Sequence, residues 1–321
     1  MDFMKGLEGY VAENLDLLSP VDQAWQPTDY LPDLTREDWS EQLRSFRETA
    51  QPLSDELLVV LVGNMVTEEA LPNYSVSLTH IAPDPSGTSP GPWSQWLRGW
   101  TSEENRHGDL LNAYLRLTGR VDMRAVERTI HHLIRNGFDS HYRGDPCAGL
   151  MYAAFQERAT RMTHLNVAKL ARQGGDENLA KICRKIAADE ARHETFYTRV
   201  VGHAMDQDPE SAVLAFRSML KGIIAMPGKL MYDGKDPDLY DHFAIIAQRL
   251  GVYTVISYAQ IIQHLIEAWG VAQLSVTGKA AKAQDYLCRQ AERYEFFADE
   301  IAANLLKQPR VAFEWIHGAT A

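Results

Sequence analysis

The segment WTSEENRHGDLL (residues 100–111) decides the fold, because it places polar side chains where a helix should present apolar ones. Trp100, Glu104, His107 and Leu111 follow the 4-3-4 spacing of a stripe that faces the interior of a helical bundle. A lone carboxylate in such an interior would cost several kcal/mol or become protonated. The segment therefore predicts that Glu104 shares a buried site with a positive partner.

A second segment, IAADEARHETF (residues 186–196), repeats this pattern. Both segments contain Glu-x-Arg-His, so Glu190 and His193, like Glu104 and His107, are spaced i and i+3 on one helix face. The second pair also belongs to a 4-3-4 stripe that faces a core. A single pair of this kind is more often found on a surface, but two matched pairs on inward faces predict one shared site.

Two further carboxylates point inward from other predicted helices. Glu68 shares a face with Met65, whereas Glu69 is turned away from that face by about 100°. Glu157 shares a face with Ala153. Either carboxylate alone would ordinarily be solvated. Together with the two Glu-x-Arg-His pairs, however, they bring four carboxylates and two imidazoles from four helices.

This combination is the ligand set of ferritin-like di-iron and di-manganese bundles, in which two helices each supply a glutamate and two others each supply Glu-x-x-His. Four carboxylates balance two divalent cations, so such a site is tolerable in a dry core. Carboxylates with two imidazoles suit iron or manganese. We therefore predict a di-metal site formed by six residues: Glu68, Glu104, His107, Glu157, Glu190 and His193.

Polar residues beside the two motifs are expected to orient the metal ligands, as the outer partners of metal sites do. Asp189, Arg106 and Arg192 are the candidates for this role. Glu103, in contrast, is expected to point away from the metal-binding face and to act only as a neighbour.

Helical periodicity dominates the chain, and the strand-like alternation of apolar and polar residues is nearly absent. Glycine- and proline-rich loops are predicted at residues 84–92 and 226–238. No shift in composition marks a domain boundary, so we predict one all-α domain (residues 1–321), a ferritin-like four-helix bundle core with additional surrounding helices. The predicted helices cover residues 7–18, 37–50, 54–80, 93–118, 122–136, 147–174, 176–206, 209–225, 237–267 and 277–307.

The composition limits the classes of partner. The formal net charge is -11, which argues against nucleic-acid binding because phosphates require a basic field. No apolar run approaches the ~18 residues of a membrane span, and the N-terminus resembles neither a signal nor a transit peptide. Three separated cysteines suit a reducing compartment. We expect a cytoplasmic protein.

At these residues the chain also resembles a known family, the soluble acyl-acyl-carrier-protein desaturases, best known from the plant stearoyl-type enzymes. Without the transit peptide of the plant proteins, the chain is similar to an untargeted, bacterial version. The likeness covers nearly the whole chain and is carried by long segments: AWQPTDYLPD, VVLVGNMVTEEALPNY, WTSEENRHGDLLNAYLRLTGRVDMR, FQERAT, IAADEARHETFYT, LMYDGKDPDLYDHF and AQRLGVYT.

The resemblance implies a homodimeric enzyme with two iron ions (Fe2+/Fe3+) per subunit. Such an enzyme uses O2 and electrons from a ferredoxin to insert a cis double bond into an acyl chain on acyl carrier protein, in fatty acid biosynthesis. By position, the resemblance implies that Glu104 and Glu190 bridge the two irons. It assigns the remaining ligands in two pairs: Glu68 with His107, and Glu157 with His193.

The resemblance also implies roles for residues that bind no metal. Thr160 matches a threonine beside the oxygen-binding face, and Thr67 matches another polar neighbour. An electron route would pass through Trp25, His107 and Asp189. From the residues alone, Trp25 is equally well explained as a packed aromatic side chain that anchors the first loop.

Contacts with the substrate and its carrier are predicted from the same likeness. Asp241 matches an aspartate at the mouth of the substrate channel, but Ile223 stands where the family has a basic residue. An acidic carrier protein would need a local basic patch, and two groups of cations are candidates, although each is more often a solvated face: Lys181, Arg184 and Lys185; Arg217, Lys221 and Lys229. Candidate walls of an acyl slot, or ordinary core residues, are Leu71, Tyr74, Leu78 and Met151.

Two alternatives to acyl desaturation remain open. A related bundle could hydroxylate or desaturate a pathway-specific acyl group on a carrier. A ferritin-like protein could store iron or remove peroxide, but the chain length, the nearly full-length likeness and the additional C-terminal helices argue against this reading.

Overall fold

The computed structural model describes residues 2–140, 142, 144–305, 307–308 and 310–316. Within this part of the chain the regular elements are helices and no β-strand forms, which confirms the predicted all-α class. The α-helices are α1 (Asp2–Gly6), α2 (Glu8–Glu13), α3 (Trp39–Ala50), α4 (Asp55–Glu68), α5 (Leu71–Ile81), α6 (Pro92–Thr118), α7 (Met123–Asn136), α8 (Pro146–Gln173), α9 (Glu177–Gln207), α10 (Pro209–Met219), α11 (Leu239–Arg249), α12 (Val255–Ala268), α13 (Gly278–Cys288) and α14 (Gln290–Leu305). The 3-10 helices are η1 (Leu15–Leu17), η2 (Val21–Gln23), η3 (Pro27–Asp29) and η4 (Val271–Gln273).

A four-helix bundle forms the centre of the molecule. Helix α4 packs against α6 and α8, and α9 packs against the same two helices, so the four close around a common interior. The long helix α6 begins with Pro92 in its first turn and ends at Thr118. Gly119 follows it with a φ of 66°, the left-handed conformation of a helix C-cap. Each bundle helix carries at least one of the six residues predicted to bind metal.

The interior of the bundle contains a polar layer between two apolar clusters. On α6, Trp100 belongs to one buried cluster and Leu110 to the other. On α9, Phe196 and Ile186 divide in the same way. The two Glu-x-Arg-His motifs lie between these positions, so the predicted ligands are shielded by packed side chains on both sides along the bundle axis.

The predicted helix over residues 54–80 is wrong in one respect, because the structure divides it into α4 and α5. Helix α4 ends at Glu68, and α5 begins at Leu71 with Pro72 in its first turn. A proline has no backbone N–H, and its ring clashes with the carbonyl four residues earlier, which here belongs to Glu68. The break therefore falls at the carboxylate predicted to bind metal.

Other predicted helices are also shorter or divided. The range 237–267 separates into α11 and α12 at Gly251, whose φ of 68° a helix does not allow, and Thr254 then caps α12. The range 277–307 divides at Arg289, 209–225 stops at Met219, and only part of 7–18 is α-helical. The loop predicted over residues 226–238 is confirmed, and the loop predicted over 84–92 is confirmed up to residue 91, because α6 begins at Pro92.

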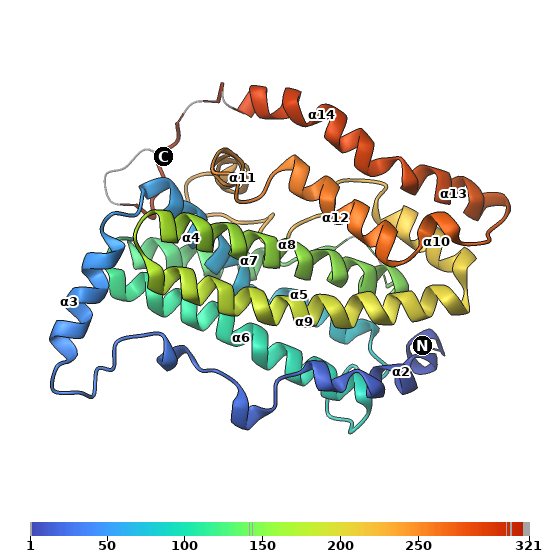
Figure 1. Ribbon diagram of the computed structural model, residues 1–321, viewed down its shortest axis with the longest axis horizontal. Coiled ribbons are helices and arrows are strands. Elements are labelled where there is room, and N and C mark those ends of the chain that lie inside the picture. The colour runs from blue at the N-terminus through green and yellow to red at the C-terminus, as the bar shows by residue number, and fades with distance from the viewer. Residues whose placement is uncertain (1, 141, 143, 306, 309, 317–321) are drawn as a thin grey trace.

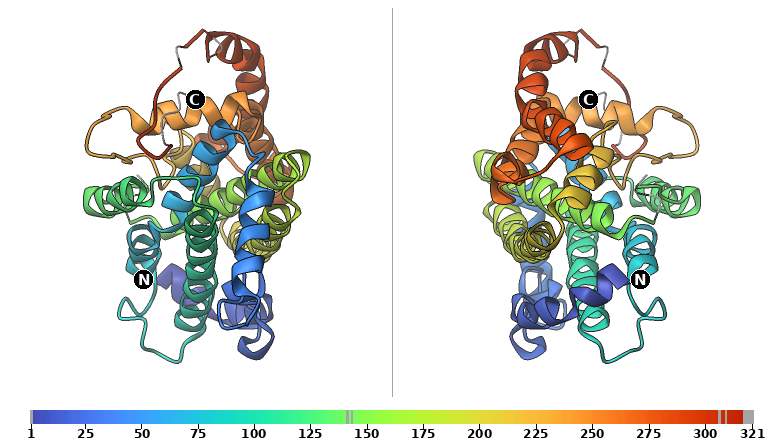
Figure 2. Two further views of the ribbon diagram at one scale, coloured as in Figure 1. Left: turned by 90° about the vertical axis from the view of Figure 1, so that its left-hand side faces the viewer. Right: turned by 90° about the vertical axis from the view of Figure 1, so that its right-hand side faces the viewer.

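The remaining segments surround the bundle. Residues 15–38 run as an extended segment with short 3-10 turns along α6 and α9, and α11 to α14 lie on another side (Figures 1 and 2). Helix α7 lies on the outside of the bundle, next to the loop that precedes α11 (Figure 2). None of the described helices has the length and apolar composition that a membrane crossing requires.

Candidate metal centre

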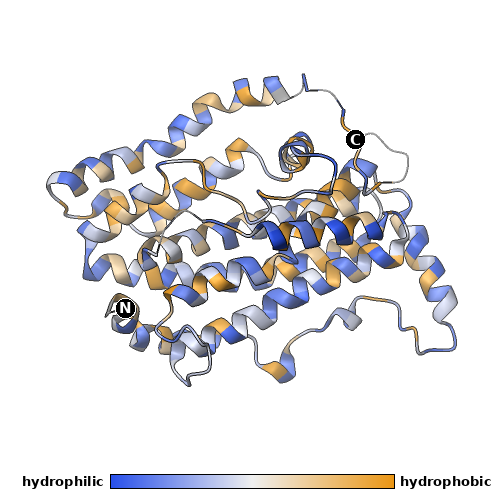
Figure 3. Ribbon diagram, turned by 180° about the vertical axis from the view of Figure 1, so that it is seen from behind, coloured by the Kyte–Doolittle hydropathy of each residue, from blue (hydrophilic) through white to orange (hydrophobic). Residues whose placement is uncertain are grey.

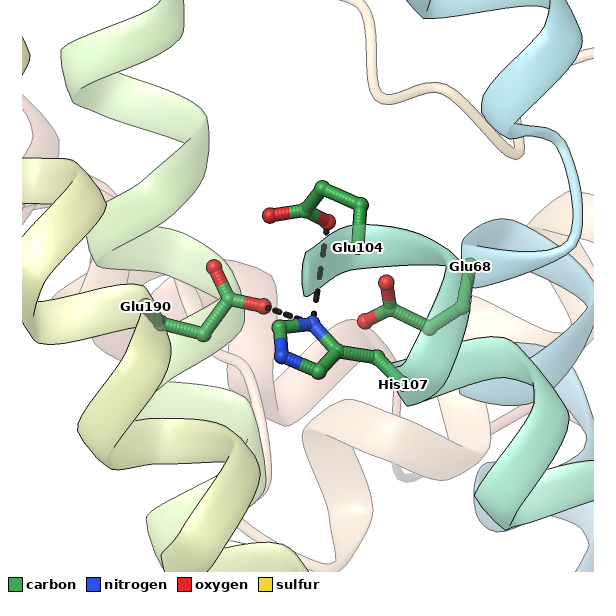
Figure 4. A group of neighbouring side chains, drawn as sticks. All are labelled: Glu68, Glu104, His107 and Glu190. Carbon is green, nitrogen blue, oxygen red and sulfur yellow. Dashed lines mark ion pairs between the residues drawn. The ribbon is translucent and has the colours of Figure 1, made fainter. Parts of the chain in front are cut away.

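The six side chains predicted to bind metal lie together in the polar layer, and each is at most 5% exposed. Their oxygen and nitrogen atoms form two overlapping groups, within which all candidate ligand atoms lie within 4.8 Å of one another. One group is Glu68, Glu104, His107 and Glu190 (Figure 4), and the other is Glu104, Glu157, Glu190 and His193. Glu104 and Glu190 belong to both groups, so they lie between the two histidines.

The distances within the cluster are short, but the atoms do not form hydrogen bonds. Nδ1 of His193 lies 2.8 Å from Oε1 of Glu104 and 3.3 Å from Oε2 of Glu157. Nδ1 of His107 lies 3.2 Å from Oε1 of Glu190 (Figure 4). The Nδ1 atoms of the two histidines and the Oε1 atoms of Glu104 and Glu190 are buried without a hydrogen-bond partner among the described residues.

Such unpartnered buried atoms are expensive and therefore informative, because burial normally requires that polar groups be satisfied. Carboxylate and imidazole atoms that converge on a small volume without forming hydrogen bonds to one another are what a cation needs. The donor set of four carboxylates and two imidazoles matches hard divalent metals. The residues present therefore fit a di-metal site.

The electrostatics of the metal-free cluster lead to the same conclusion. Burial raises the pKa of Glu190 well above its usual value, and the charge of Glu104 raises it further. Burial and the charge of Glu104 also raise the pKa of Glu157. Burial opposes ionisation of Glu104 too, but contacts with His107 and His193 lower its pKa to about 2. Without cations, burial and the charge of Glu104 therefore favour the protonated forms of Glu190 and Glu157.

His107 is supported from behind by Asp189 and Trp25. Nε2 of His107 lies 3.4 Å from Oδ2 of Asp189, and the indole N–H of Trp25 donates to the same oxygen at 2.7 Å. The Trp25 ring also stacks on the His107 imidazole, with centroids 6.2 Å apart and planes inclined by 5°. The structure thus brings together the three residues that the family likeness connects as an electron route.

His193 is supported in the same way by Glu103, which corrects one expectation. Glu103 is 3% exposed, and its Oε2 lies 2.9 Å from Nε2 of His193. It does not point away from the site, because the segment before Trp25 covers this side of α6 and the backbone N–H of Ser19 donates to its Oε1 at 2.7 Å. Adjacent residues on α6 therefore contact opposite sides of the same imidazole.

A single arginine links the two supporting carboxylates. Nη2 of Arg192 lies 2.8 Å from Oε2 of Glu103 and 2.6 Å from Oδ1 of Asp189. Arg192 therefore has the orienting position that its motif predicted. Arg106, from the other motif, instead places its guanidinium 5.3 Å from the ring centre of Trp25.

Each of the four clustered glutamates also has one donor nearby. Thr160 donates to Oε2 of Glu190 at 2.9 Å, and the indole N–H of Trp100 donates to Oε1 of Glu157 at the same distance. The Tyr74 hydroxyl lies 3.5 Å from Oε2 of Glu104. These donors hold carboxylates that would otherwise face only one another.

The residue that donates to Glu68 was not predicted from the sequence. His164 is 1% exposed, and its Nε2 lies 3.0 Å from Oε1 of Glu68. A signal was present, because Glu157, Thr160 and His164 follow a 3-4 spacing on one face of α8. The Nδ1 atom of His164 has no hydrogen-bond partner in the described part of the chain.

A mostly apolar pocket opens beside the cluster, and its empty volume of about 560 Å³ includes space that is open to solvent. Thr67 and Thr160 both belong to its wall, and Thr67 donates its hydroxyl to the carbonyl of Gly63. Of the four predicted wall residues, Tyr74 and Leu78 line it, whereas Leu71 and Met151 are packed in the core. The wall comprises Thr67, Glu68, Tyr74, Ser77, Leu78, Trp100, Glu104, Phe138, Tyr142, Tyr152, Ala153, Gln156, Glu157, Thr160, Glu190 and Pro227.

Asp241 lies on the surface and is linked to this pocket through a loop. Its Oδ1 atom is 2.5 Å from Nζ of Lys229. The preceding residue, Gly228, approaches Thr67 so closely that a Cβ would lie 2.8 Å from its Oγ1. Ile223, which stands where the family likeness expected a cation, is 82% exposed. The only cation paired with Asp241 among the described residues is therefore Lys229.

Comparisons with known proteins cover almost the whole chain. The profile of a family described as fatty acid desaturase matches residues 1–317. A chloroplastic stearoyl-[acyl-carrier-protein] 9-desaturase of Spinacia oleracea is 48% identical over 320 residues, which cover 98% of this chain and 80% of that protein. A chloroplastic acyl-[acyl-carrier-protein] desaturase of Cucumis sativus is also 48% identical over 320 residues, covering 98% and 81%.

Among solved structures, the DesA2 protein of Mycobacterium tuberculosis has a similar fold. Its TM-score is 0.57 at 20% sequence identity, with 85% of this chain and 96% of that chain covered. At this identity the likeness concerns the arrangement of the helices.

Proposed function

The chain belongs to the fatty acid desaturase family, as an acyl-[acyl-carrier-protein] desaturase, and we propose that it inserts a cis double bond into a carrier-bound acyl chain with O2 and electrons from a ferredoxin. The observation that carries this proposal is the contact between the buried Glu/His cluster and the apolar pocket, which share Glu68, Glu104, Glu157 and Glu190. An acyl chain in this pocket would lie directly against the metal-binding carboxylates.

The proposed cofactor is a pair of iron ions per subunit. Glu104 and Glu190, which belong to both groups of candidate ligands, would help to hold both ions. Glu68 with His107 would complete the set that holds one ion, and Glu157 with His193 the set that holds the other. When bound, the two irons would make the oxidising power of O2 available to the acyl chain. The overall reaction then balances as one O2, two electrons and two protons consumed, two hydrogens removed from adjacent methylenes, and two waters formed.

The protein's own part in the reaction is to position the chain and to exclude water. Leu78 and Phe138 supply apolar walls, and the indole N–H of Trp100 fixes Glu157 beside them. The hydroxyls of Thr160 and Thr67 belong to the same wall, so we propose that they face the O2 that reaches the cluster. Thr160 would also hold Glu190 in one orientation.

Electrons would enter through Trp25, Asp189 and His107. The proposal is supported by their continuous contact, from the indole N–H of Trp25 through the Asp189 carboxylate to Nε2 of His107. Trp25 is the most exposed of the three, at 7% against 1% for Asp189 and 0% for His107, so a donor protein would approach the route from the Trp25 end. A structural role for Trp25 in anchoring its loop is compatible with the same contacts.

The wider setting follows from the family and from the free thiols. We propose a homodimer, which analytical ultracentrifugation would detect. We also propose a reducing compartment, the cytoplasm, because Cys147 and Cys183 are free and buried. Burial raises the pKa of the Cys147 thiol to about 12, so this side chain stays protonated.

The test is reconstitution with purified components. The iron content is measured first, and the enzyme is then incubated with ferredoxin, its reductase, O2 and a series of acyl-carrier-protein thioesters. A product mass lower by two hydrogens supports desaturation, whereas the addition of one oxygen atom would support the hydroxylase alternative. Absence of turnover at every chain length would contradict both.

A further inference from the structure

The outward face of α7 carries a row of basic side chains. Arg124, Arg128, His131 and Arg135 follow a 4-3-4 spacing, and all four are exposed. The opposite face of the helix is apolar and buried against the bundle. Seen from behind, α7 lies in front of the bundle with strongly hydrophilic residues along it (Figure 3). We call these four residues the basic face of α7.

No acidic side chain in the described part of the molecule forms an ion pair with Arg124, Arg128 or Arg135. The glutamate of the same helix, Glu127, is paired with Arg116 instead, at 2.9 Å. Like charges spaced i and i+4 destabilise a helix by some tenths of a kcal/mol, roughly 0.2–0.5 per pair. A chain with a net charge of -11 thus keeps an unneutralised basic row at a cost in helix stability.

Other groups of basic side chains differ in this respect. The two groups singled out in the sequence as possible docking patches each contain cations with partners inside the molecule. These pairs are Lys229 with Asp241, Arg217 with the Tyr286 ring and Arg184 with Glu177. Their charge is therefore partly satisfied, whereas that of the basic face of α7 is not.

The C-terminal end of α7, which carries this basic face, is also next to the acyl pocket. The side-chain amide of Asn136, the last residue of α7, donates to the carbonyl of Leu230 at 2.9 Å, and His132 lies 5.0 Å from the Tyr232 ring. These contacts join α7 to the loop whose Pro227 lines the pocket. Phe138, two residues beyond α7, belongs to the pocket wall as well.

We propose that the basic face of α7 is the docking surface for the acyl carrier protein. The inference rests on the proposed function, since it identifies where that carrier is held while its acyl chain occupies the pocket. Acyl carrier protein is acidic, so its carboxylates complement the unpaired guanidinium groups. Charge complementarity of this kind raises the association rate and fixes the orientation of the partner.

Two other occupants fit less well. In a two-fold dimer the same patch of both copies meets, so the arginines of α7 would face one another and repel. A nucleic acid would encounter an overall charge of -11, which opposes binding beyond this one helix.

The test removes charge from α7 in the full-length, iron-loaded enzyme. The variant is Arg124→Gln/Arg128→Gln/Arg135→Gln, in which glutamine keeps the helix propensity close to that of arginine. We expect the KM for acyl carrier protein thioester to rise about tenfold or more with kcat within twofold, and the salt dependence of KM to weaken. Direct binding of labelled carrier protein, measured by fluorescence anisotropy, should weaken by the same factor.

A charge-matched control separates docking from net charge. Lys279, Lys282 and Arg289 lie exposed on and next to α13, away from α7 (Figure 1). Their replacement by glutamine changes the net charge equally and should leave KM within twofold. A second variant, Arg128→Glu, should raise KM more than Arg128→Gln does.

The outcomes distinguish the inference from the function on which it rests. If the wild-type enzyme is active and the α7 variant has an unchanged KM, the docking surface is overturned and the desaturase function stands. The same holds if the control variant shows an equal rise in KM. A change of oligomeric state in the α7 variant would make this face a contact between copies and would also overturn it. Failure of the wild-type enzyme to bind or convert any acyl carrier protein thioester overturns both.

Discussion

Glu103 contacts His193 from the side opposite the clustered carboxylates, with Oε2 2.9 Å from Nε2. The neighbouring residue, Glu104, lies 2.8 Å from Nδ1 of the same ring. One imidazole is thus held between two successive residues of α6, and only one of them belongs to the proposed metal ligands. A carboxylate behind a ligating histidine fixes the ring and raises its basicity.

Replacement of Glu103 by glutamine should weaken metal binding without removing a ligand. The amide keeps the shape but loses the negative charge, and such changes typically reduce metal affinity about 10–100-fold. Chelator competition with Fe2+ or Mn2+ measures the effect. Glu69→Gln is the matched control, because Glu69 is next to Glu68 in the chain but accepts a hydrogen bond from the side-chain amide of Asn112. Equal affinity in the Glu103 variant and the wild type would contradict the role of Glu103.

His164 should hold Glu68 in place. His164→Leu removes the donor at Nε2, so a buried carboxylate oxygen loses its partner at a cost of about 1–3 kcal/mol in the metal-free protein. We expect a lower melting temperature and less than two irons bound per chain. His164→Gln, whose amide can also donate, should recover most of the iron. Leucine and glutamine variants with the same iron content would contradict the assignment.

Removal of the metal should destabilise the fold. A ligand that binds only the folded state adds RT ln(1 + [L]/Kd) to its stability, about 4 kcal/mol at a thousandfold excess over Kd. Dialysis against a chelator should lower the melting temperature, and added Fe2+ or Mn2+ should restore it. A Glu104→Gln/Glu190→Gln variant should show neither change. An identical melting temperature with and without chelator in the wild type would contradict the site.

Metal binding should release protons and should weaken in acid. Burial raises the pKa of Glu190 and Glu157, so the metal-free site retains protons that a cation must displace. Lower pH favours the protonated, metal-free form of the site and therefore lowers its affinity for the metal. Titration calorimetry in buffers of different ionisation enthalpy counts the protons. A metal affinity that stays constant between about pH 8 and about pH 6 would contradict this proton release.

Much of the architecture was predictable because several long helices, such as α6 and α9, show a clear apolar face in the sequence. The failures occurred at breaks within long apolar patterns. Pro72 and Gly251 each interrupt a stretch that keeps its periodicity on both sides, so the pattern predicts one helix where the backbone forms two. Periodicity reports which face is buried, whereas the end of a helix depends on the backbone of one residue.

The six clustered residues were predictable for a related reason. Polar side chains at core positions are costly, so their presence on four inward faces indicates a shared cation. Glu103 and His164 were not found in this way. Glu103 is off the core stripe of α6 and is buried only because residues 15–19 cover it. His164 lies on the same face of α8 as Glu157, but its partner, Glu68, belongs to α4 and reaches it only when the two helices pack together.

The sequence by itself therefore determined the all-α class, the inward carboxylates and imidazoles, and the family, because spacing and residue type are properties of single helices. Only the tertiary structure decided which carboxylate supports which histidine, which residues line the pocket and which cations remain unpaired. Arg128 and Arg184 look alike in the sequence, but only Arg184 has a partner, Glu177, in the described fold. Pairing depends on the distance between side chains of different turns and helices, and folding alone fixes that distance.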